Sequence, residues 1–335
     1  SQSYPGRKVG EQSRLKLAKC YYKSRRYNKA NAELKNFIGR VKDKELVAEA
    51  YFLLAQVNEA LGLRIKAIRY FRRAAKELKN PIILAQAYYA LGWDYWQIKH
   101  FDYSSIWFNL ILKRFPKSRL IPAVRLRLAE CFISLKNYPK AILQLEKFIS
   151  ENPKHKNINS IIYWLAETYS AAGMDNNARA LYEKLIKASV YLGRAYYGMG
   201  WLYYREKEYK KSRAMFYKAI EKSRDEVLNA EVLLKIGDMY CLEKNFTDAI
   251  QIYTQILEKY PGKKSDRVLY QMADAYEKAG RLDKAVASFG TLIYGYPKSR
   301  LLMIARYKEG NIYFKQGLFK KALNCYKEVF DKTVI

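Results

Sequence analysis

The feature that most constrains this chain is a small residue that returns nine times at a nearly constant spacing. These nine anchors are Ala18, Ala55, Gly92, Ala129, Ala166, Gly200, Gly237, Ala273 and Gly310. Six of the eight intervals between them are 37 residues long, and the other two are 34 and 36 residues long. A second small residue follows each anchor by 12 positions, and a large apolar residue follows it by 16 positions. This regularity indicates a repeat protein, in which each unit packs only against its neighbours along the chain.

Each repeat predicts two helices, helix A with the anchor and helix B with the second small residue and the large residue. In helix A an aromatic residue stands three positions after the anchor in every repeat except the second, which has Asn58. Four repeats carry a proline 24 positions after the anchor, and these prolines are Pro116, Pro153, Pro261 and Pro297. Proline cannot continue a helix, so helix B should end just before it. Ser118 and Ser299 follow two of these prolines and are predicted to be the N-caps of the next helix A.

The small, aromatic, small, large and proline positions resemble the tetratricopeptide repeat over about residues 12–332. That resemblance implies an all-α fold, a right-handed α-α superhelical solenoid of about nine helix pairs. We therefore expect a lead-in at residues 1–11 and a single solenoid of nine repeats at residues 12–335. In this family helices A line the concave side of the superhelix, and the concave groove holds protein partners.

The length of the repeat is typical of one subclass of tetratricopeptide repeats. The family's usual unit has 34 residues, and here three more residues stand in most of the connections from helix B to the next helix A. Repeats of this form resemble those of bacterial envelope proteins, such as outer-membrane assembly lipoproteins and the Tol–Pal-associated periplasmic protein. The resemblance favours the bacterial periplasm or cell envelope over the cytoplasm. Four cysteines in separate repeats are more typical of a reducing compartment, and we expect Cys20 and Cys131 to be buried as small apolar residues.

Several classes of function lack their sequence signals. The four cysteines and two histidines are too scattered for a metal site, and no phosphate-binding glycine loop or nucleophile motif is present. We therefore predict that the chain is not an enzyme and holds no metal or cofactor. It has no run of about 18 apolar residues, and its first ten residues have no apolar core of a signal peptide. Because it begins without methionine, we expect a fragment of a longer chain, with cleavage to a mature form as the alternative.

One stripe along helix A is the candidate binding surface. The helix-A stripe comprises the places −6, −3, +1, +4 and +5 relative to each anchor, which share one face of a helix. Its central repeats are rich in aromatic residues, namely Tyr89, Trp93, Trp96, Tyr163, Tyr197, Trp201 and Tyr204. Four of its carboxylates are predicted to pair with basic groups of the partner, namely Glu130, Glu167, Asp238 and Asp274. Aromatic residues dominate binding hot spots, although they also fill gaps between neighbouring helices.

The charge of the chain points to a second surface. The net charge is +30, whereas the helix-A stripe holds seven basic and eight acidic residues. The basic excess should therefore lie on helices B and the connections, in a basic outer face of Arg69, Arg72, Arg73, Lys76, Lys113, Arg114, Lys117, Arg119, Arg125 and Arg127. An anionic protein, polymer or membrane surface fits such a face, and solubility alone is the alternative. Nucleic acid is disfavoured because no known binding module is visible.

The leading hypothesis is a non-catalytic scaffold that binds a protein or peptide segment in the aromatic groove and docks its basic outer face on an anionic partner. The alternative is a module of envelope assembly that binds polysaccharide or cell wall, for which the tryptophans must form a free stacking platform. A third hypothesis is an adaptor that uses only the basic face.

The last repeat departs from the others. Glu309 stands where eight repeats have leucine, methionine or isoleucine, and no polar capping helix precedes Ile335. Terminal repeats need a polar outer face, so the apolar side of the last helix B should be uncovered. A chain cut short would explain this end, and self-association or partner docking there is the alternative.

Overall fold

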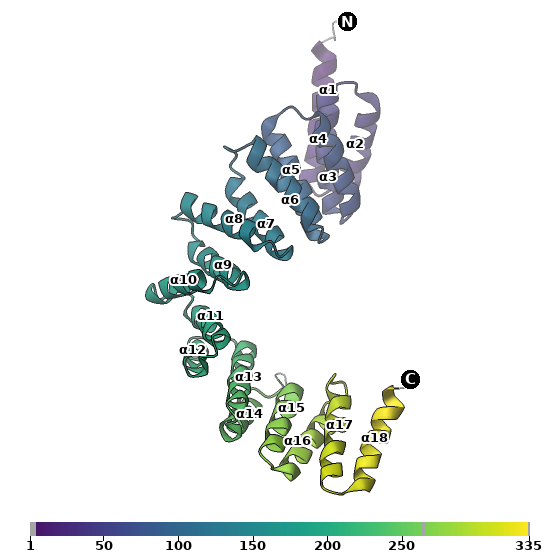
Figure 1. The fold of residues 1–335 in the computed structure, drawn as a ribbon. Helices are drawn as coiled ribbons and strands as arrows, with labels where there is room; N and C mark the ends of the chain where they lie inside the picture. Colours follow the sequence, from purple (N-terminus) through teal and green to yellow (C-terminus); the bar gives the residue numbers. More distant parts are fainter. Residues whose placement is uncertain (1–4, 263–264, 334–335) are drawn as a thin grey trace. The chain divides into compact units, whose positions relative to one another are not determined.

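The protein is described by a computed structural model that covers residues 5–262 and 265–333, and within these residues it forms eighteen α-helices and no strand (Figure 1). The helices are α1 (Pro5–Lys23), α2 (Tyr27–Arg40), α3 (Lys44–Ala60), α4 (Arg64–Glu77), α5 (Pro81–Gln97), α6 (Phe101–Arg114), α7 (Ile121–Ser134), α8 (Tyr138–Glu151), α9 (Ile158–Ala171), α10 (Asp175–Lys187), α11 (Leu192–Arg205), α12 (Tyr209–Glu221), α13 (Glu226–Leu242), α14 (Phe246–Lys259), α15 (Ser265–Lys278), α16 (Leu282–Gly295), α17 (Leu302–Lys315) and α18 (Phe319–Thr333). Every anchor lies on an odd-numbered helix, so the predicted nine helix pairs are confirmed.

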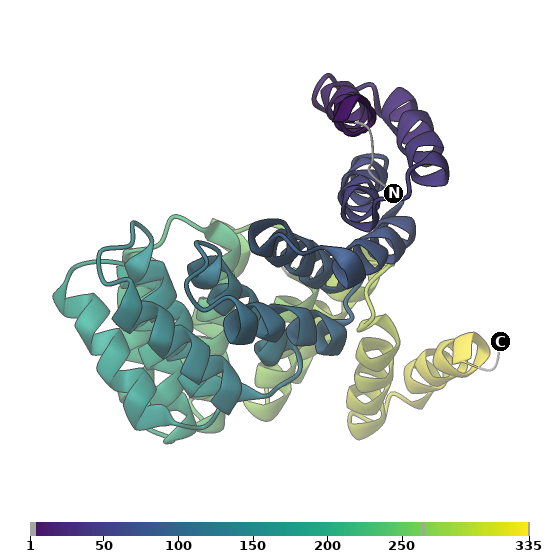
Figure 2. The same ribbon diagram turned by 90° about the horizontal axis from the view of Figure 1, so that it is seen from above.

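The chain divides into two compact units, residues 1–178 and residues 179–335. The first unit holds α1 to α9 and the start of α10, and the second holds the rest of α10 and α11 to α18. Within each unit, helices that are consecutive in the sequence lie side by side as hairpins (Figures 1 and 2). The first helix begins at Pro5, so helix A of the first repeat starts inside the predicted lead-in. One continuous solenoid over residues 12–335 remains a prediction.

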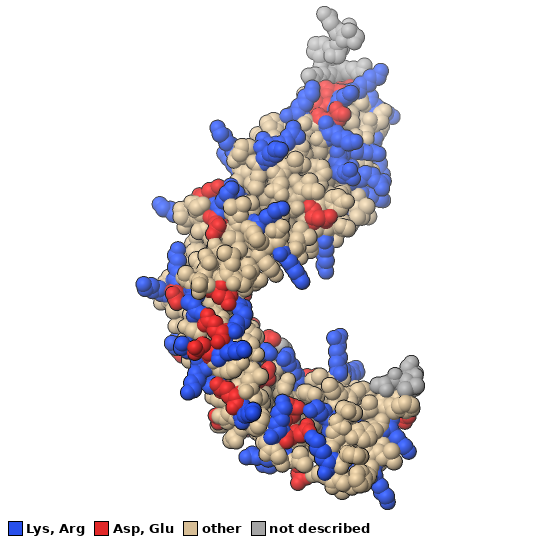
Figure 3. Space-filling view, in the orientation of Figure 1, with Lys and Arg blue, Asp and Glu red and all other residues tan. Residues whose placement is uncertain are grey.

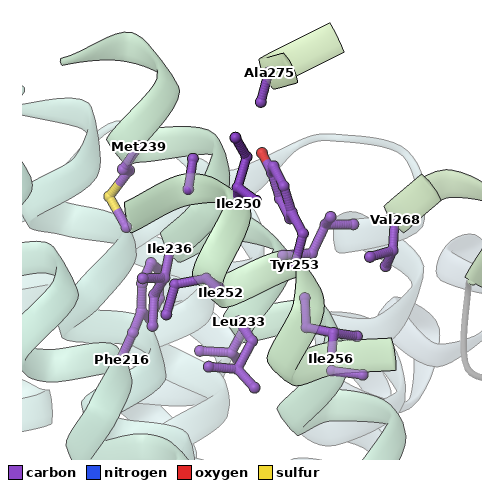
Figure 4. Packing of buried hydrophobic residues seen from close by; sticks show 14 residues of the cluster. Phe216, Leu233, Ile236, Met239, Ile250, Ile252, Tyr253, Ile256, Val268 and Ala275 are labelled. Carbon is purple, nitrogen blue, oxygen red and sulfur yellow. The ribbon is translucent and has the colours of Figure 1, made fainter. Parts of the chain in front are cut away.

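The anchors are small because a large side chain of helix B lies directly against them. Gly237 on α13 faces Tyr253 on α14, and a Cβ atom on Gly237 would lie 2.3 Å from Cε1 of that ring. Gly92 and Gly200 meet Phe108 and Phe216 in the same way. Figure 4 shows Tyr253 among apolar side chains from α12 to α15, where its ring is completely buried. Burial of such a side chain contributes roughly 1.5–3 kcal/mol, and this contact recurs along the array.

The connections follow the sequence pattern with one difference. Helices α6, α8, α14 and α16 each end two residues before their proline, as predicted. The N-cap prediction for Ser118 and Ser299 is wrong, because α7 and α17 begin three residues after them. Ser118 Oγ instead accepts a hydrogen bond from the Leu120 N–H at 3.2 Å, and Ser299 Oγ accepts one from the Leu301 N–H at 3.1 Å. Each serine thus stabilises the turn before the helix rather than the helix end itself.

Every turn between helices A and B has one residue in the left-handed conformation. That residue is glycine in four repeats and lysine or arginine in the other five. Gly62, Gly173, Gly280 and Gly317 have φ angles of 72–75°. Lysine or arginine fills the same place in the other repeats, for example Lys136 with φ 56°. Glycine takes this conformation without a steric cost, whereas a side chain does not.

The predictions for the cysteines and for the last repeat are confirmed only in part. Cys131 is buried as predicted, but Cys20 is exposed, because it lies on a face of α1 that no described helix covers. In the last helix, Phe319 and Leu323 are exposed as expected. Glu309, in contrast, is buried and only 6% exposed, and it forms an ion pair with Arg306 at 2.8 Å.

Candidate protein-interaction site

The eleven residues predicted for the groove lie on helices A of both units. The first unit holds Tyr89, Trp93, Trp96, Glu130, Tyr163 and Glu167, and the second holds Tyr197, Trp201, Tyr204, Asp238 and Asp274. All eleven side chains are half-buried. They therefore combine contact with neighbouring helices and access to solvent, which is the condition of a surface that can bind a partner.

The densest aromatic group of the first unit lies where α5 meets α7. The rings of Trp93 and Trp96 are stacked, with centroids 5.2 Å apart and planes 5° from parallel. The Arg127 guanidinium of α7 lies 4.7 Å from the Trp93 centroid and 5.8 Å from the Trp96 centroid. A cation over an indole ring is attracted by the negative face of the ring. Stacking and this cation together hold both tryptophans in one arrangement.

Two of the arginines predicted for the basic outer face do not lie there as free charges. Arg127 contacts Trp93 and forms an ion pair with Glu130 at 2.6 Å, so it belongs to the helix-A stripe. Burial alone would lower the pKa of Arg127, but the bond to Glu130 outweighs it and raises that pKa. Arg125 makes two hydrogen bonds with the carboxylate of Glu151, at 2.7 and 2.8 Å. Both arginines are on helix A, four and two places before the anchor Ala129, so their positions in the repeat already separated them from the basic residues of helix B.

The second unit holds a comparable aromatic group on α11. Trp201 meets the edges of Tyr197 and Tyr204 at centroid distances of 6.1 and 5.4 Å. Its ring also contacts Phe216 on α12 at 5.8 Å, and Lys235 of α13 lies 6.0 Å from it. Burial raises the pKa of the Tyr204 hydroxyl. The group is therefore neutral and apolar around Trp201, with one cation at its border.

The carboxylates of the stripe are engaged within the chain rather than available for a partner. Asp238 accepts hydrogen bonds from Lys235 at 3.3 Å and from the Tyr253 hydroxyl at 3.1 Å. Asp274 is paired with Lys278 and Lys308. Burial alone would raise the pKa of Asp274, but the bonds from these two lysines outweigh it and lower that pKa. Glu167 also interacts within the chain.

A column of basic residues two places before the anchor explains these pairs, and the sequence reading missed it. Arg127 lies against Trp93 and Trp96, Lys235 lies against Trp201, and Lys308 pairs with Asp274 and with Glu277 at 3.1 and 3.4 Å. In these three repeats the place −2 of helix A thus contacts the place +1 of the preceding helix A, and in two of them also the place +4. The signal was readable, because the place −2 holds four basic residues and no acidic one among nine repeats. With this column included, the charge of the stripe is +3 rather than −1.

The other eight residues of the predicted basic outer face are all exposed. They are Arg69, Arg72, Arg73, Lys76, Lys113, Arg114, Lys117 and Arg119. Figure 3 shows one face of each unit, with Lys and Arg side chains spread over most helices and Asp and Glu in smaller groups. None of the eight forms an ion pair with a residue in the described part of the chain. Their positive charge is therefore not neutralised within the protein.

A buried pair of carboxyl groups lies between the second and third repeats. Asp94 on α5 is fully buried, and its Oδ1 accepts a hydrogen bond from Arg64 at 3.3 Å. Burial raises the pKa of Glu59 to about 8, and the neighbouring Asp94 carboxylate adds to the shift. Burial also raises the pKa of Asp94 to about 6, against the opposing effect of Arg64. Glu59 therefore keeps its proton at neutral pH.

This pair predicts that the first unit loses stability as pH rises. Both carboxyls bind protons more tightly in the folded than in the unfolded chain, so the free energy of unfolding should fall between about pH 4 and pH 8, by at least about 1 kcal/mol. Urea unfolding followed by circular dichroism across that range measures the fall. The slope should become smaller in Asp94→Asn but not in Glu77→Gln, which changes an exposed carboxylate on α4. Parallel pH profiles for wild type and Asp94→Asn would show that the pair does not titrate in this range.

Among the described residues there is no group of three or more His, Cys, Asp and Glu side chains that could hold a metal ion. None of the helices, over the residues described, combines the length and apolar character needed to cross a bilayer.

The fold and the repeat pattern have relatives among known proteins. Residues 84–285, more than half of the chain, match the YfiO family, described as outer membrane lipoprotein. Residues 15–80 match a tetratricopeptide repeat family. The curated tetratricopeptide repeat protein 21A of Mus musculus is 28% identical over 145 residues, which cover 42% of this chain and 11% of that protein. This chain thus spans only a small part of the length of that relative.

Solved structures agree on the fold. The C-terminal part of a tetratricopeptide repeat-containing protein from Cytophaga hutchinsonii superposes with a TM-score of 0.58 at 17% identity, over 72% of this chain and 94% of that one. The apo form of the quorum sensor NprR from B. thuringiensis gives 0.53 at 12% identity, over 96% and 97%. The structure of Naa15/Naa10 bound to HypK gives 0.52 at 14% identity, over 96% of this chain and 50% of that one. The chain belongs to the YfiO family of outer membrane lipoproteins, within the tetratricopeptide repeat fold.

Proposed function

We propose that this chain is a non-catalytic scaffold that binds a protein segment along its helix-A stripe. The observation that carries the proposal is the half-buried aromatic group of Trp93, Trp96 and Arg127 on a fold of the tetratricopeptide type. Proteins of this fold are typically interaction scaffolds, and one similar structure, that of Naa15/Naa10, is itself a complex with HypK. Tryptophan and arginine are the residues most enriched in binding hot spots.

Recognition at this site rests on apolar contact rather than on charge pairing. Glu130 and Asp238 are already held by Arg127 and Lys235, so they form a polar border around the aromatic groups. The Trp96 indole N–H is shielded from solvent and has no hydrogen-bond partner among the described residues. Because the rings are already fixed by stacking, little side-chain freedom would be lost on binding.

The polysaccharide alternative requires tryptophan faces that are free to stack on a sugar. Trp93 and Trp96 lie on each other and against Arg127, and Trp201 is bordered by Tyr197, Tyr204 and Phe216. This arrangement supports a protein partner better than a sugar. The eight exposed basic residues support the second part of the proposal, in which the basic outer face docks on an anionic partner.

The test is capture of a partner from a nuclease-treated native lysate by the wild-type chain and by Trp93→Ala/Trp96→Ala. Loss of two hot-spot residues should weaken capture at least about tenfold, at about 0.15 M and at about 0.5 M salt alike. The matched control is Tyr103→Ala, which removes a ring on α6 that is exposed and stacked on Tyr95 but lies outside the stripe. It should leave capture unchanged.

Two outcomes count against the stripe. Capture that survives the double variant but disappears at the higher salt would assign binding to the basic outer face. Equal loss with Tyr103→Ala would show that binding does not depend on the stripe.

A further inference from the structure

A pocket of about 810 Å³ opens at the junction between the third and fourth repeats, and of its lining residues only Gln86 belongs to the helix-A stripe. Its floor is apolar and comes from two elements. The start of α5 contributes Pro81, Ile82 and Ala85, and the connection from α6 to α7 contributes Phe115 and Leu120. Ile82 is 69% exposed although it is a large apolar residue. An exposed apolar side chain beside an apolar pocket adds to the surface that a ligand could cover.

The rim of the pocket is basic. Arg114, Lys117 and Arg119 line it, and none of its eleven lining residues is acidic. Arg114 donates a hydrogen bond to the Tyr88 hydroxyl at 2.7 Å, which fixes the guanidinium but leaves its charge uncompensated. Lys117 and Arg119 are exposed and form no ion pair with any residue of the described chain. No acidic residue occurs between residues 103 and 129, so nothing nearby in the sequence neutralises them.

The next connection of this kind along the chain lacks the combination. The same connection one repeat later also contains a proline, Pro153, but it encloses about 320 Å³. That smaller pocket is lined by Glu151, Asn152, Lys154 and His155 and has no apolar floor. An apolar floor with a basic rim therefore does not follow from the repeat as such, although α4 carries a smaller one of about 330 Å³, lined by Ile65, Ile68 and four basic residues.

We propose that this pocket binds an acidic protein segment in which one large apolar side chain is flanked by carboxylates. The apolar side chain would lie on Ile82, Ala85 and Leu120, and the carboxylates would meet Lys117 and Arg119. The exposed Gln86 amide at the edge can bond the backbone of the segment. The inference rests on the basic outer face of the proposed function and names the partner of that face.

A membrane surface fits this edge less well. Insertion into anionic lipid needs several exposed apolar side chains along one edge. Four connections join a helix B to the next helix A in the first unit, namely α2–α3, α4–α5, α6–α7 and α8–α9. Within these connections and the first two residues of each following helix, Ile82 is the one exposed large apolar side chain. A single site with a deep floor favours one side chain of a peptide over a lipid layer.

The probe for this site is a fluorescein-labelled synthetic peptide with one phenylalanine between two pairs of aspartates, and its binding is followed by fluorescence anisotropy at about 0.05 M salt. Ile82→Asp and Lys117→Glu/Arg119→Glu should each weaken binding by about tenfold or more. Ile65→Asp is the matched control, because Ile65 is 62% exposed beside the basic residues of α4 but lies outside this pocket. It should change binding less than about twofold. Probe peptides with alanine for phenylalanine, or asparagine for aspartate, should also bind about tenfold more weakly.

The outcomes separate this inference from the proposed function. In one outcome, Ile65→Asp weakens probe binding as much as Ile82→Asp does, or Arg69→Glu/Arg72→Glu weakens it as much as the pocket variants do. That outcome would overturn the pocket but would still support binding by the basic outer face. No binding of the probe at all would overturn the pocket and leave the stripe untouched. Ile82-dependent binding to vesicles of phosphatidylcholine and phosphatidylserine, without binding of the probe, would replace the peptide by a lipid surface.

Discussion

Replacing Arg306 by methionine is expected to destabilise the last repeat by about 3–5 kcal/mol, because it leaves a buried carboxylate without its partner. Arg306 is 8% exposed and Glu309 is 6% exposed, and their ion pair measures 2.8 Å. Arg306 also lies 2.9 Å from Glu328 on α18, so one guanidinium joins the two helices of this repeat. Native-state hydrogen exchange of peptides from α17 and α18 measures the loss locally.

The double variant Arg306→Met/Glu309→Leu should recover most of that stability. The other repeats carry leucine, methionine or isoleucine at the place of Glu309, so the fold accepts an apolar side chain there. Replacing a buried ion pair by apolar residues of similar volume is often neutral or stabilising. If the double variant exchanges as fast as Arg306→Met, the arginine acts through its contacts with Tyr294 and Glu328 rather than through Glu309.

The second large effect is expected at an anchor. Gly237→Ala should destabilise the seventh repeat by about 1–3 kcal/mol, although alanine favours a helix over glycine by about 1 kcal/mol. The added Cβ would lie 2.3 Å from the ring of Tyr253. That ring cannot move aside easily, because it is completely buried and its hydroxyl is bonded to Asp238. Hydrogen exchange of peptides from α13 and α14 reports the change.

Gly290→Ala is the matched control for the anchor. Gly290 also lies inside a helix, α16, but a Cβ atom there would meet nothing within 4 Å. This variant should gain up to about 1 kcal/mol from helix propensity alone. Stabilisation by both variants would mean that the helices can separate, and that small anchors are not required for their close approach.

The repeat pattern predicted the fold because it depends on contacts that recur at fixed spacings. An anchor and the large residue 16 positions later recur nine times in the sequence, and they meet at all four glycine anchors. The ends of helices B before proline were predictable because proline ends a helix whatever packs against that helix. The cap at Ser118 was not predicted correctly, because the Ser118 hydroxyl bonds the Leu120 N–H within the turn and α7 begins only at Ile121.

The candidate site was only partly predictable because its contacts join neighbouring repeats. Arg127 and Trp93 are 34 positions apart, and periodicity within one helix says which face a residue takes but not which side chain of the next repeat covers it. Arg306 was missed as the partner of Glu309 for another reason: the two residues lie three positions apart on one helix, but an apolar residue was expected at the place before the anchor. The pocket at Ile82 depends on the start of α5 and the α6–α7 connection, which meet only in the folded chain.

The turns with a left-handed lysine or arginine have a consequence for engineering. Arg25, Lys99, Lys136, Lys207 and Lys244 occupy a backbone region that glycine enters without strain. Four other repeats already have glycine there, so glycine at these five places is expected to relieve backbone strain and to raise the unfolding temperature. A thermostable version of this scaffold could be built at these turns alone, with every residue of the helix-A stripe and of the pocket left as it is.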